Sequence, residues 1–532
     1  NVKLPKKAIV LNNGKYEYSD QDITIDANGI PSASNWPEIS SYENDNGNFT
    51  DVKIDGNGKT IKNFCYIAED ENASFFSSLS NSTVKDITFL NAYVKAKTVS
   101  AGNRCGSLCD ASVVTNTAEH VAFENVAVKG AAVYGWQTST LAITAKTGST
   151  NLNTPAVSLS HVTIQDVTLS MTRDVIAEYS DAEYRYDLQS ASGGVVANLG
   201  GHFKMDDSLK VLNLSVPDSI SKVFKDVTNK EYVGHRYVGG IAGHFSPSAD
   251  HADIVLDSIE VSAALSGLWV GGLFGKIYIN TAPKISSGEI PQIDGVSNFK
   301  VKDSKVTLNS PGRLSAGDSA CYFGGLVGEL IWWKGAVSLS NNTVDVSADW
   351  RGNSDYLKPA HMGGLVGLVT GGKEVALVDV SAENDTVTAE MLTSSRNVYA
   401  GGILGRANLA TDDLGSSGTV SILASKVKAK ESNLITTTAK ECILVNASYL
   451  VGNAVTRGGN INILQNHAEG NIYIANDLLT APGGVGAEVG LTWSYGAKIY
   501  NNTSVGDLLV KKAVGAAGSK ICRGYVAGKL QG

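Results

Sequence analysis

The sequence predicts an all-β protein, a parallel β-helix with about 41 residues in each coil, and three observations support this fold class. Glycine is concentrated in a short pattern that recurs along the chain. The copies are separated by intervals that average about 41 residues, and short runs of alternating apolar and polar residues follow them. A fixed anchor with variable spacing is typical of a solenoid, in which loops of changing length leave a constant frame.

The composition agrees with a large folded core. The 532 residues include 56 glycines and 11 prolines, with 43% hydrophobic and 18% charged residues. Glycine exceeds its usual share of about 7%. The hydrophobic content excludes disorder, and the absence of a triplet period excludes collagen. A formal charge of −8 argues against nucleic-acid binding, because phosphate contacts need clustered lysine and arginine. No apolar run reaches the roughly 18 residues of a transmembrane helix, so none is predicted.

A double glycine, two further residues and a closing glycine define the anchor of each repeat. The five clear copies contain Gly239, Gly240, Gly243, Gly271, Gly272, Gly275, Gly324, Gly325, Gly328, Gly363, Gly364, Gly367, Gly401, Gly402 and Gly405. Weaker copies end at Gly106, Ala197, Gly452, Gly490 and Gly528. We expect each double glycine to lie at a corner of a coil, where positive φ or close backbone packing excludes a Cβ.

The residues around the closing glycines have different expected environments. Apolar residues such as Leu326, Leu365 and Ile403 should stack from coil to coil inside the solenoid. The position after the closing glycine varies in chemistry, which predicts a solvent-facing column with no site. Its members are Asn198, His244, Lys276, Glu329, Leu368, Arg406 and Asn453.

Short alternating segments fill the remainder of each repeat. Valine, isoleucine and threonine at a period of two, as in residues 255–261, 343–346 and 386–388, predict strands with one buried face. Asn341-Asn342 and Asn501-Asn502 separate paired strands, and asparagine favours tight turns. About three strands per repeat favour a β-helix over a β-propeller, whose blades have a similar length but need four antiparallel strands.

The repeat region and the N-terminal segment are predicted as separate parts. Residues 1–48 lack the anchor and contain Pro5, Pro31 and Pro37, so we predict an N-terminal cap there and the β-helix over residues 49–532. A solenoid needs its open end covered to prevent edge pairing. At the other end the last anchor closes at Gly528, which predicts an uncapped final coil unless something follows or docks there.

The anchors resemble the GLUG repeat. The similarity is carried by Gly-Gly-Leu-Phe-Gly at residues 271–275 and Gly-Gly-Leu-Val-Gly at 324–328 and 363–367, and residues 52–63 resemble its usual opening coil. Such repeats occur in bacterial surface and secreted proteins, including adhesin-like proteins and the non-catalytic parts of IgA-specific metallopeptidases. The resemblance implies a right-handed β-helix, a bacterial origin and export. It implies no peptidase activity, because no histidine here is followed by glutamate, as the zinc motif His-Glu-x-x-His requires.

No catalytic, metal or cofactor site is predicted. Adjacent aspartates at 206–207 and 412–413 are the candidates for enzyme chemistry, but such pairs in loops are typical of solvated turns, and β-helix hydrolases need two carboxylates at a set separation. An aromatic binding platform is the stronger candidate. It would consist of Trp333, Trp350, Arg351 and Tyr356, whose rings could stack on a sugar or peptide. Alternation along a strand places only one of Trp332 and Trp333 outward.

Two functions therefore remain open. The first is a non-catalytic binding or adhesion protein of the bacterial surface or of the extracellular space, which presents loops to a host protein or glycan. The alternative is a carbohydrate-active or protease-associated β-helix protein. The chain begins at Asn1 without a visible signal peptide, as a mature exported protein would.

Overall fold

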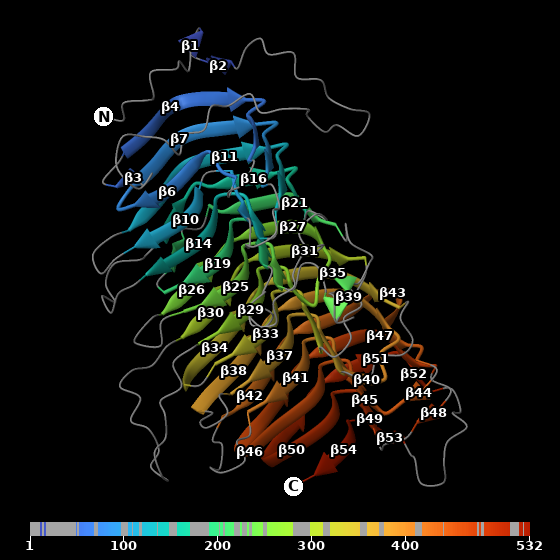
Figure 1. Ribbon diagram of the computed structural model, residues 1–532. Helices are drawn as coiled ribbons and strands as arrows, with labels where there is room; N and C mark the ends of the chain where they lie inside the picture. Colours follow the sequence, from blue (N-terminus) through green and yellow to red (C-terminus); the bar gives the residue numbers. More distant parts are fainter. Residues whose placement is uncertain are drawn as a thin grey trace. The chain divides into compact units, whose positions relative to one another are not determined.

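A computed structural model gives the structure of the chain (Figure 1). The residues that it describes are 11–12, 15–17, 49–50, 53–68, 73–96, 105–108, 110–115, 120–135, 137–147, 157–170, 191–201, 203–205, 208–217, 224–225, 231–232, 237–247, 253–279, 298–311, 320–332, 334–351, 359–371, 377–409, 418–439, 441–475, 478–479, 483–510, 521–524 and 526–531. Over these residues every regular element is a β-strand, as the sequence predicts. Within the same ranges no helix is long and apolar enough to cross a membrane.

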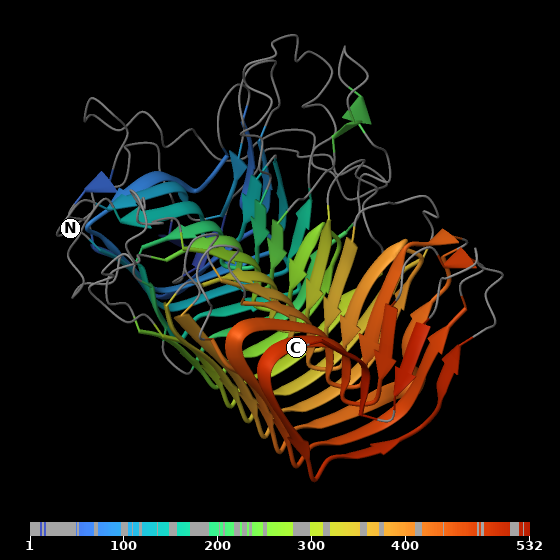
Figure 2. The ribbon, with the colours of Figure 1, turned by 90° about the horizontal axis from the view of Figure 1, so that it is seen from below.

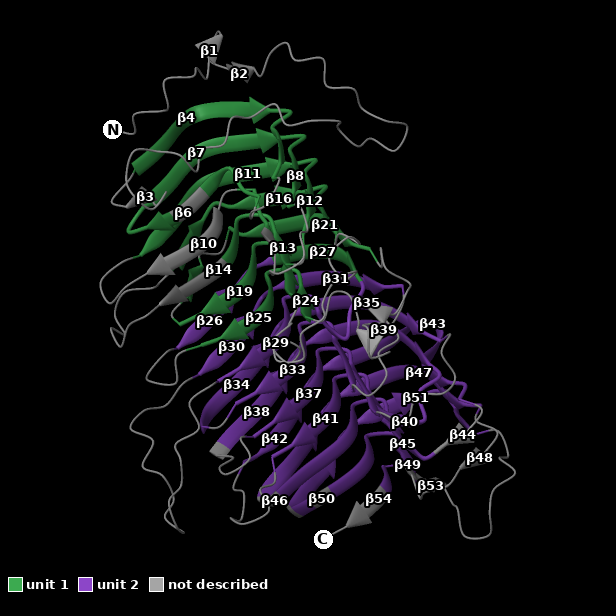
Figure 3. Ribbon diagram, viewed as in Figure 1, with its two compact units in different colours: residues 1–247, 260–265 green, residues 248–259, 266–532 purple. Residues whose placement is uncertain are grey.

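The chain forms two compact units (Figure 3). Unit 1 comprises residues 1–247 and 260–265, and unit 2 comprises residues 248–259 and 266–532. Each unit contains sheets of three kinds. Strands of the approach sheet lead into an anchor, strands of the departure sheet follow the anchor, and strands of the long sheet follow a polar turn.

Unit 1 contains the first set of these sheets. Its approach sheet consists of β9 (Cys105–Gly106), β13 (Gln137–Ser139), β18 (Ala191–Gly193) and β24 (Tyr237–Gly239). Its departure sheet consists of β3 (Phe49–Thr50), β6 (Phe76–Ser80), β10 (Asp110–Thr115), β14 (Ala142–Thr147), β19 (Val196–Gly200) and β25 (Ala242–Ser246). Its long sheet contains β4 (Lys53–Lys62), β5 (Cys65–Ile67), β7 (Thr83–Leu90), β8 (Tyr93–Lys95), β11 (Val121–Lys129), β12 (Ala132–Tyr134), β15 (Val157–Ser160), β16 (Thr163–Gln165), β17 (Thr168–Ser170), β20 (Phe203–Met205), β21 (Lys210–Val216) and β27 (Glu260–Leu265). A separate hairpin pairs β22 (Phe224–Lys225) with β23 (Glu231–Tyr232).

Unit 2 repeats the arrangement with longer strands. Its approach sheet consists of β28 (Trp269–Gly271), β32 (Cys321–Gly324), β36 (Pro359–Gly363), β40 (Asn397–Gly401), β45 (Leu444–Ser448), β49 (Gly483–Gly486) and β53 (Ile521–Gly524). Its departure sheet contains β26 (Ile254–Asp257), β29 (Phe274–Tyr278), β30 (Phe299–Lys302), β33 (Val327–Ile331), β34 (Lys334–Ser340), β37 (Val366–Thr370), β38 (Leu377–Glu383), β41 (Leu404–Asn408), β42 (Val420–Leu423), β46 (Val451–Leu464), β50 (Val489–Tyr500) and β54 (Ala527–Gln531). Its long sheet consists of β31 (Lys305–Ser310), β35 (Thr343–Trp350), β39 (Thr386–Thr393), β43 (Lys426–Thr437), β47 (His467–Ile474), β51 (Thr503–Val505) and β52 (Leu508–Val510). A further short pair joins β44 (Glu441–Cys442) to β48 (Leu478–Leu479).

The strands of all three sheets pair in parallel with the equivalent strands of the next repeat. In unit 2, β35 pairs with β39 along its whole length, from Thr343 opposite Thr386 to Trp350 opposite Thr393. Figure 2 shows these stacked strands from below. Parallel pairing between equivalent strands confirms the predicted repeat and is that of a β-helix-like solenoid.

The interior of unit 2 is built from columns of apolar side chains. The residues between the double glycine and the closing glycine form one column, in which Leu326, Leu365, Ile403 and Leu450 are all 0% exposed. Val344, Val387 and Val427 of the long sheet form a second buried column. Alternation along each strand sends these residues inward and their neighbours outward. The columns give the core its continuity from one coil to the next.

Close backbone packing explains the glycine anchors. A Cβ on Gly324 would lie 1.9 Å from the carbonyl oxygen of Val327, within the same corner. A Cβ on Gly325 would lie 2.1 Å from the carbonyl oxygen of Gly364 in the next coil. Real Cβ atoms do not approach backbone oxygens so closely, so the corner and the coil stacking both exclude a side chain. The sequence left positive φ open as an alternative cause, but neither glycine has a positive φ.

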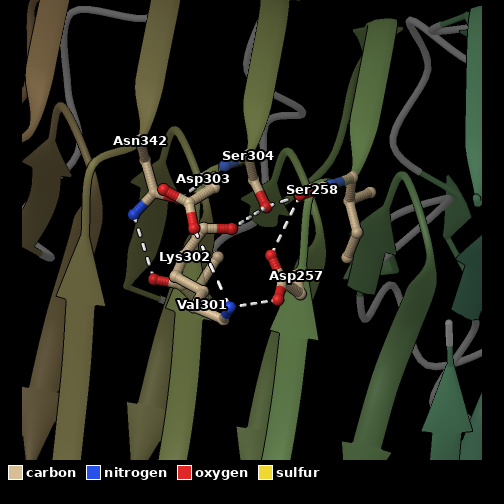
Figure 4. A network of polar contacts seen from close by, with 8 residues as sticks. Asp257, Ser258, Val301, Lys302, Asp303, Ser304 and Asn342 are labelled. Carbon is tan, nitrogen blue, oxygen red and sulfur yellow. Dashed lines mark hydrogen bonds and ion pairs between the residues drawn. The ribbon is translucent and has the colours of Figure 1, made fainter. Parts of the chain in front are cut away.

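The polar turns before the long sheet hold residues in the left-handed region. Asn341, Asn384 and Asn501 have φ between 55° and 57°, a conformation that asparagine tolerates better than most residues. The next residue of each turn is inward and hydrogen-bonded between coils (Figure 4): Asn342 Nδ2 donates to the carbonyl of Val301 at 3.1 Å. Ser304, 38 positions before Asn342, donates its backbone N–H to Asn342 Oδ1 at 3.1 Å.

The predicted N-terminal cap falls mostly outside the described residues. Within it, β1 (Leu11–Asn12) and β2 (Lys15–Glu17) form an antiparallel hairpin. Strand β2 pairs in parallel with β4, Tyr16 lying opposite Ile61. The hairpin therefore adds a strand beside β4, the first long strand of unit 1.

Candidate binding site

The structure places one residue of the predicted aromatic platform, Trp350, in the interior. Trp350 is 2% exposed, so the expectation of an outward ring at this position is wrong. Its indole packs edge-on against Phe323 at 5.7 Å between centroids, and its Nε1 donates to Ser310 Oγ at 3.0 Å. The alternation of β35 accounts for this, because Val344, Val346, Ala348 and Trp350 all occupy its buried face.

The other platform residues give a mixed result. Arg351 is exposed, and its Nε and Nη2 donate to the two carboxylate oxygens of Asp349 at 2.8 and 2.6 Å. These bonds lower the pKa of Asp349. Trp333 and Tyr356, like the aspartate pairs at 206–207 and 412–413, lie outside the described residues. Trp332 is 0% exposed and packs against Phe299.

A column of stacked rings runs along the approach sheet of unit 2. Trp269 and Tyr322 stack at 5.1 Å, Tyr322 and His361 at 5.0 Å, and His361 and Tyr399 at 4.9 Å. Parallel pairing places these residues directly opposite one another on β28, β32, β36 and β40. His361 is 2% exposed, and burial holds its pKa well below the usual value, so the ring is neutral at pH 7.

Charged residues after the closing glycines contact this ring column. Glu329 Oε2 accepts a hydrogen bond from Trp269 Nε1 at 2.7 Å and pairs with Lys276 Nζ at 3.1 Å. Arg406 lies over the Tyr399 ring at 4.7 Å. The expectation of a solvent-facing column is wrong at three positions, because Glu329, Leu368 and Asn453 are 6%, 8% and 4% exposed. At Glu329 the contacts with Trp269 and Lys276 join this coil to the preceding one.

A cavity of about 700 Å³ lies at the C-terminal end of the described coils of unit 2. Its walls come from the corners that precede β46, β50 and β54 and from the polar turn and strands that follow β50. The lining residues are Tyr449, Ala487, Glu488, Ile499, Tyr500, Asn501, Asn502, Ser504, Gly506, Asp507, Leu508, Gly524 and Val526. This volume is in the range typical of small-molecule sites, about 300–1,000 Å³.

Glu488 places a carboxyl group in a column that is otherwise apolar. It occupies the anchor position held by Ile403 and Leu450 in the two preceding coils, both 0% exposed. Glu488 is itself 5% exposed, and its Oε1 accepts a hydrogen bond from Ser504 Oγ at 2.7 Å. Burial raises the pKa of Glu488, and the bond from Ser504 opposes part of that rise. A buried carboxyl group with a single partner among the described residues is costly to retain in a purely structural core.

Ser504 marks the same change on the opposite wall. It lies opposite Ala468 of β47, in the column that begins with the inward valines of the long sheet. Ala468 is 1% exposed, whereas Ser504 is exposed to the cavity. Two interior columns thus change from apolar to polar at the same level of the stack, and the two new side chains are bonded to each other.

Tyr449 spans the interior at this level. It stands in place of the second anchor glycine, since its backbone follows Ser448, which pairs with Gly401. The residue is 1% exposed, and its hydroxyl lies beside Gly506, where a Cβ would come within 3.0 Å of the phenolic oxygen. That hydroxyl has no hydrogen-bond partner among the described residues. Burial and the negative charges of Asp507 and Glu488 raise the pKa of Tyr449 to about 12.

The remaining walls combine amides with apolar surface. Asn502 Nδ2 donates to the carbonyl of Ile463 at 2.8 Å, which fixes the turn at the cavity edge. Tyr500 and Val526 are 53% and 48% exposed, a large fraction for apolar side chains. The cavity can therefore offer carboxylate, amide and hydroxyl groups beside an aromatic ring, the combination that small polar ligands require.

Sequence reasoning did not identify these residues, although the anchors contained a signal. The weak copies Ser-Tyr-Leu-Val-Gly and Gly-Ala-Glu-Val-Gly depart from the pattern at Tyr449 and Glu488. A glutamate in a column of leucine and isoleucine contradicts the repeat locally, and such contradictions are enriched at functional sites.

Within the described ranges no three or more histidine, cysteine, aspartate or glutamate side chains are grouped to hold a metal ion. Compared with protein-family models, curated proteins and solved structures, the chain matches none of them.

Proposed function

We propose that this protein is a non-catalytic binding protein and that the cavity bordered by Tyr449, Glu488 and Ser504 is its ligand site. The observation that carries the proposal is Glu488, a buried carboxyl group in a column that is apolar in the preceding coils. A solenoid supplies a rigid frame for such a site, because each coil is held by its neighbours. The stability lost to the buried charge is compensated when a ligand pairs with it.

The finer architecture and the cellular location belong to the same proposal. The coils are right-handed, contain about 41 residues each and are covered at the N-terminal end by residues 1–48. The anchors at 271–275, 324–328 and 363–367 are GLUG repeats. The protein acts at the bacterial surface or after secretion, where a host protein or glycan supplies the ligand. The resemblance of the anchors supports these statements.

A glycan and host-protein binding array tests the proposal. The wild-type chain is compared with Glu488→Leu, which restores the apolar column, and with Glu431→Gln as a matched control on an exposed carboxylate. We expect specific binding by the wild type and the control, and loss of that binding in Glu488→Leu. Binding by no protein on the array, or equal binding by all three, would refute the assignment of the cavity.

One observation favours a second candidate, glycoside hydrolysis. Two carboxyl groups, Glu488 and Asp507, line the cavity, and the raised pKa of Glu488 suits a general acid. Release of reducing sugar from a panel of polysaccharides tests this alternative. Turnover that is lost in both Glu488→Gln and Asp507→Asn would establish it, and binding without turnover would exclude it.

A further inference from the structure

The charged side chains in the described walls of the cavity are acidic. Glu488 and Asp507 line it, and none of the described residues in its walls is lysine, arginine or histidine. Both carboxylates act on one atom, since the negative charges of both raise the pKa of Tyr449. A positively charged ligand would be attracted by both groups and would favour the ionised form of Glu488.

Tyr449 supplies an independent indication of a ligand. Tyr449 lines the cavity, and its hydroxyl is buried and has no partner among the described residues. An unpaired buried hydroxyl costs about 1–3 kcal/mol, so native structures rarely retain one without a partner. The phenolic oxygen can accept a hydrogen bond. The two carboxylates, when ionised, are acceptors and have no hydrogen to donate. Three acceptors match the three N–H donors of a primary ammonium group.

The size and the walls of the cavity argue for an organic cation over a metal ion. A volume of about 700 Å³ far exceeds the space of a single coordinated ion. Ile499, Leu508 and Val526 give apolar walls, and the exposed ring of Tyr500 lies at the edge. An ammonium group beside tyrosine rings gains cation–π attraction of about 0.5–1 kcal/mol at an exposed position.

We propose that the cavity binds an organic cation, with the primary ammonium group held by Glu488, Asp507 and Tyr449 and the body of the ligand against Tyr500 and Val526. This inference rests on the proposed function, in which the cavity is the ligand site. The amine of an amino sugar and the side-chain amine of lysine share this chemistry. Acetylation removes the charge and two of the three donors from either source.

Isothermal titration calorimetry with paired probes tests the inference. One pair is the glucosamine trimer and its N-acetylated form, and the other is Nα-acetyl-lysine amide and its Nε-acetylated form. We expect at least one amine to bind and its acetylated partner to bind about tenfold or more weakly, the loss typical of a charge-assisted hydrogen bond. The pair that shows the difference identifies the source of the amine.

Three variants and a control assign the binding to the cavity. Glu488→Gln and Asp507→Asn should each weaken amine binding about tenfold, whereas Tyr449→Phe should weaken it about threefold. Asp507→Asn keeps the bond from the Asp507 backbone N–H to Asn471 Oδ1, so it reports on charge even where Glu488→Gln folds poorly. Glu431→Gln should bind as the wild type does.

The outcomes separate the inference from the proposed function. Equal binding of free and acetylated probes, tighter binding of Ca²⁺ than of either amine, or amine binding that Asp507→Asn leaves unchanged would overturn the organic cation. If a neutral glycan binds and Glu488→Leu abolishes that binding, the assignment of the cavity as the ligand site is supported and the organic cation as its ligand is refuted. If neither the array nor the amines give binding, both fail.

Discussion

Replacing Asp385 with asparagine should stabilise the chain at neutral pH. Asp385 is 0% exposed and follows Asn384 in a polar turn. Its Oδ1 accepts hydrogen bonds from the backbone N–H and the Nδ2 of Asn342 at 2.8 and 2.9 Å. Its Oδ2 is buried and has no partner among the described residues. The equivalent residue is asparagine at Asn342 and Asn466. In both, Oδ1 accepts a hydrogen bond from a backbone N–H and Nδ2 donates one to a backbone carbonyl.

The register identifies the partner that the new amide would find. Asn342 Nδ2 donates to the carbonyl of Val301, which lies opposite Leu339 in the next coil. An asparagine at position 385, one coil further on, would therefore donate to the carbonyl of Leu339. The substitution keeps the Oδ1 acceptor to which Asn342 donates, and it replaces the unpartnered Oδ2 with an N–H donor.

The magnitude follows from the shifted pKa. Burial raises the pKa of Asp385 from 3.8 to about 6, and the hydrogen bonds from Asn342 limit the rise. A shift of about 2 units corresponds to about 3 kcal/mol, the cost of ionising the buried group above pH 6. Because the folded pKa is the higher one, this cost is absent below about pH 4, develops as pH rises to about 6 and is constant above that. We expect Asp385→Asn to be more stable by about 2–3 kcal/mol at pH 7.

Urea unfolding followed by circular dichroism between pH 4 and pH 8 measures the effect. The two proteins are compared through transition midpoints, since repeat proteins need not unfold in a single step. Asp345→Asn serves as the control, because it makes the same change at a carboxylate of β35 whose side chain is exposed and pairs with Lys430 at the surface. Equal stability at pH 7, or a difference that does not shrink as the pH falls toward 4, would refute the reasoning.

Three further predictions test the packing and the site. Gly364→Ala should destabilise the chain by about 3 kcal/mol or more in urea unfolding, because its Cβ would lie 1.9 Å from the carbonyl oxygen of Gly402. Trp350→Phe should cost about 1–2 kcal/mol through the lost bond to Ser310, and it should leave every ligand on the binding array unaffected. Glu488→Leu should unfold at higher urea than the wild type. Since burial raises the pKa of Glu488, that advantage should grow as pH rises from 4.5 through the folded pKa.

Each of these has its own check. Gly496→Ala places a Cβ 2.8 Å from Asn460 Oδ1, the end of a flexible side chain, so it should cost less than Gly364→Ala. Loss of glycan or protein binding in Trp350→Phe would restore the aromatic platform as a site. A Glu488→Leu protein that is less stable than the wild type at pH 7 would show that Glu488 contributes to the fold itself.

The fold followed from local patterns that the tertiary structure preserves. Alternation gave the strands and their inward faces, and asparagine at Asn341 and Asn501 correctly indicated the turns. The same alternation, applied to β35, would have placed Trp350 on the buried face with Val344 and Val346. Trp350 was misassigned because its indole was considered apart from the strand that carries it.

The candidate site was harder to predict because its residues are distant in sequence. Tyr449 meets Glu488 and Ser504 only when parallel pairing stacks two successive coils. The anchor alignment showed two departures from the pattern, but it did not show that they share a cavity with Asp507.

The sequence by itself determined the repeat, the strands, the glycine corners and the polar turns, because each depends on residues a few positions apart. Only the tertiary structure decided which side chains are buried, paired or left without a partner, since those properties depend on the residue that the next coil places opposite. Glu329 shows the difference: its position after an anchor suggested solvent, yet Trp269 and Lys276 of the preceding coil cover and bind it. The position of a residue along its strand determines whether its side chain points inward or outward, and the neighbouring coil determines which groups surround that side chain.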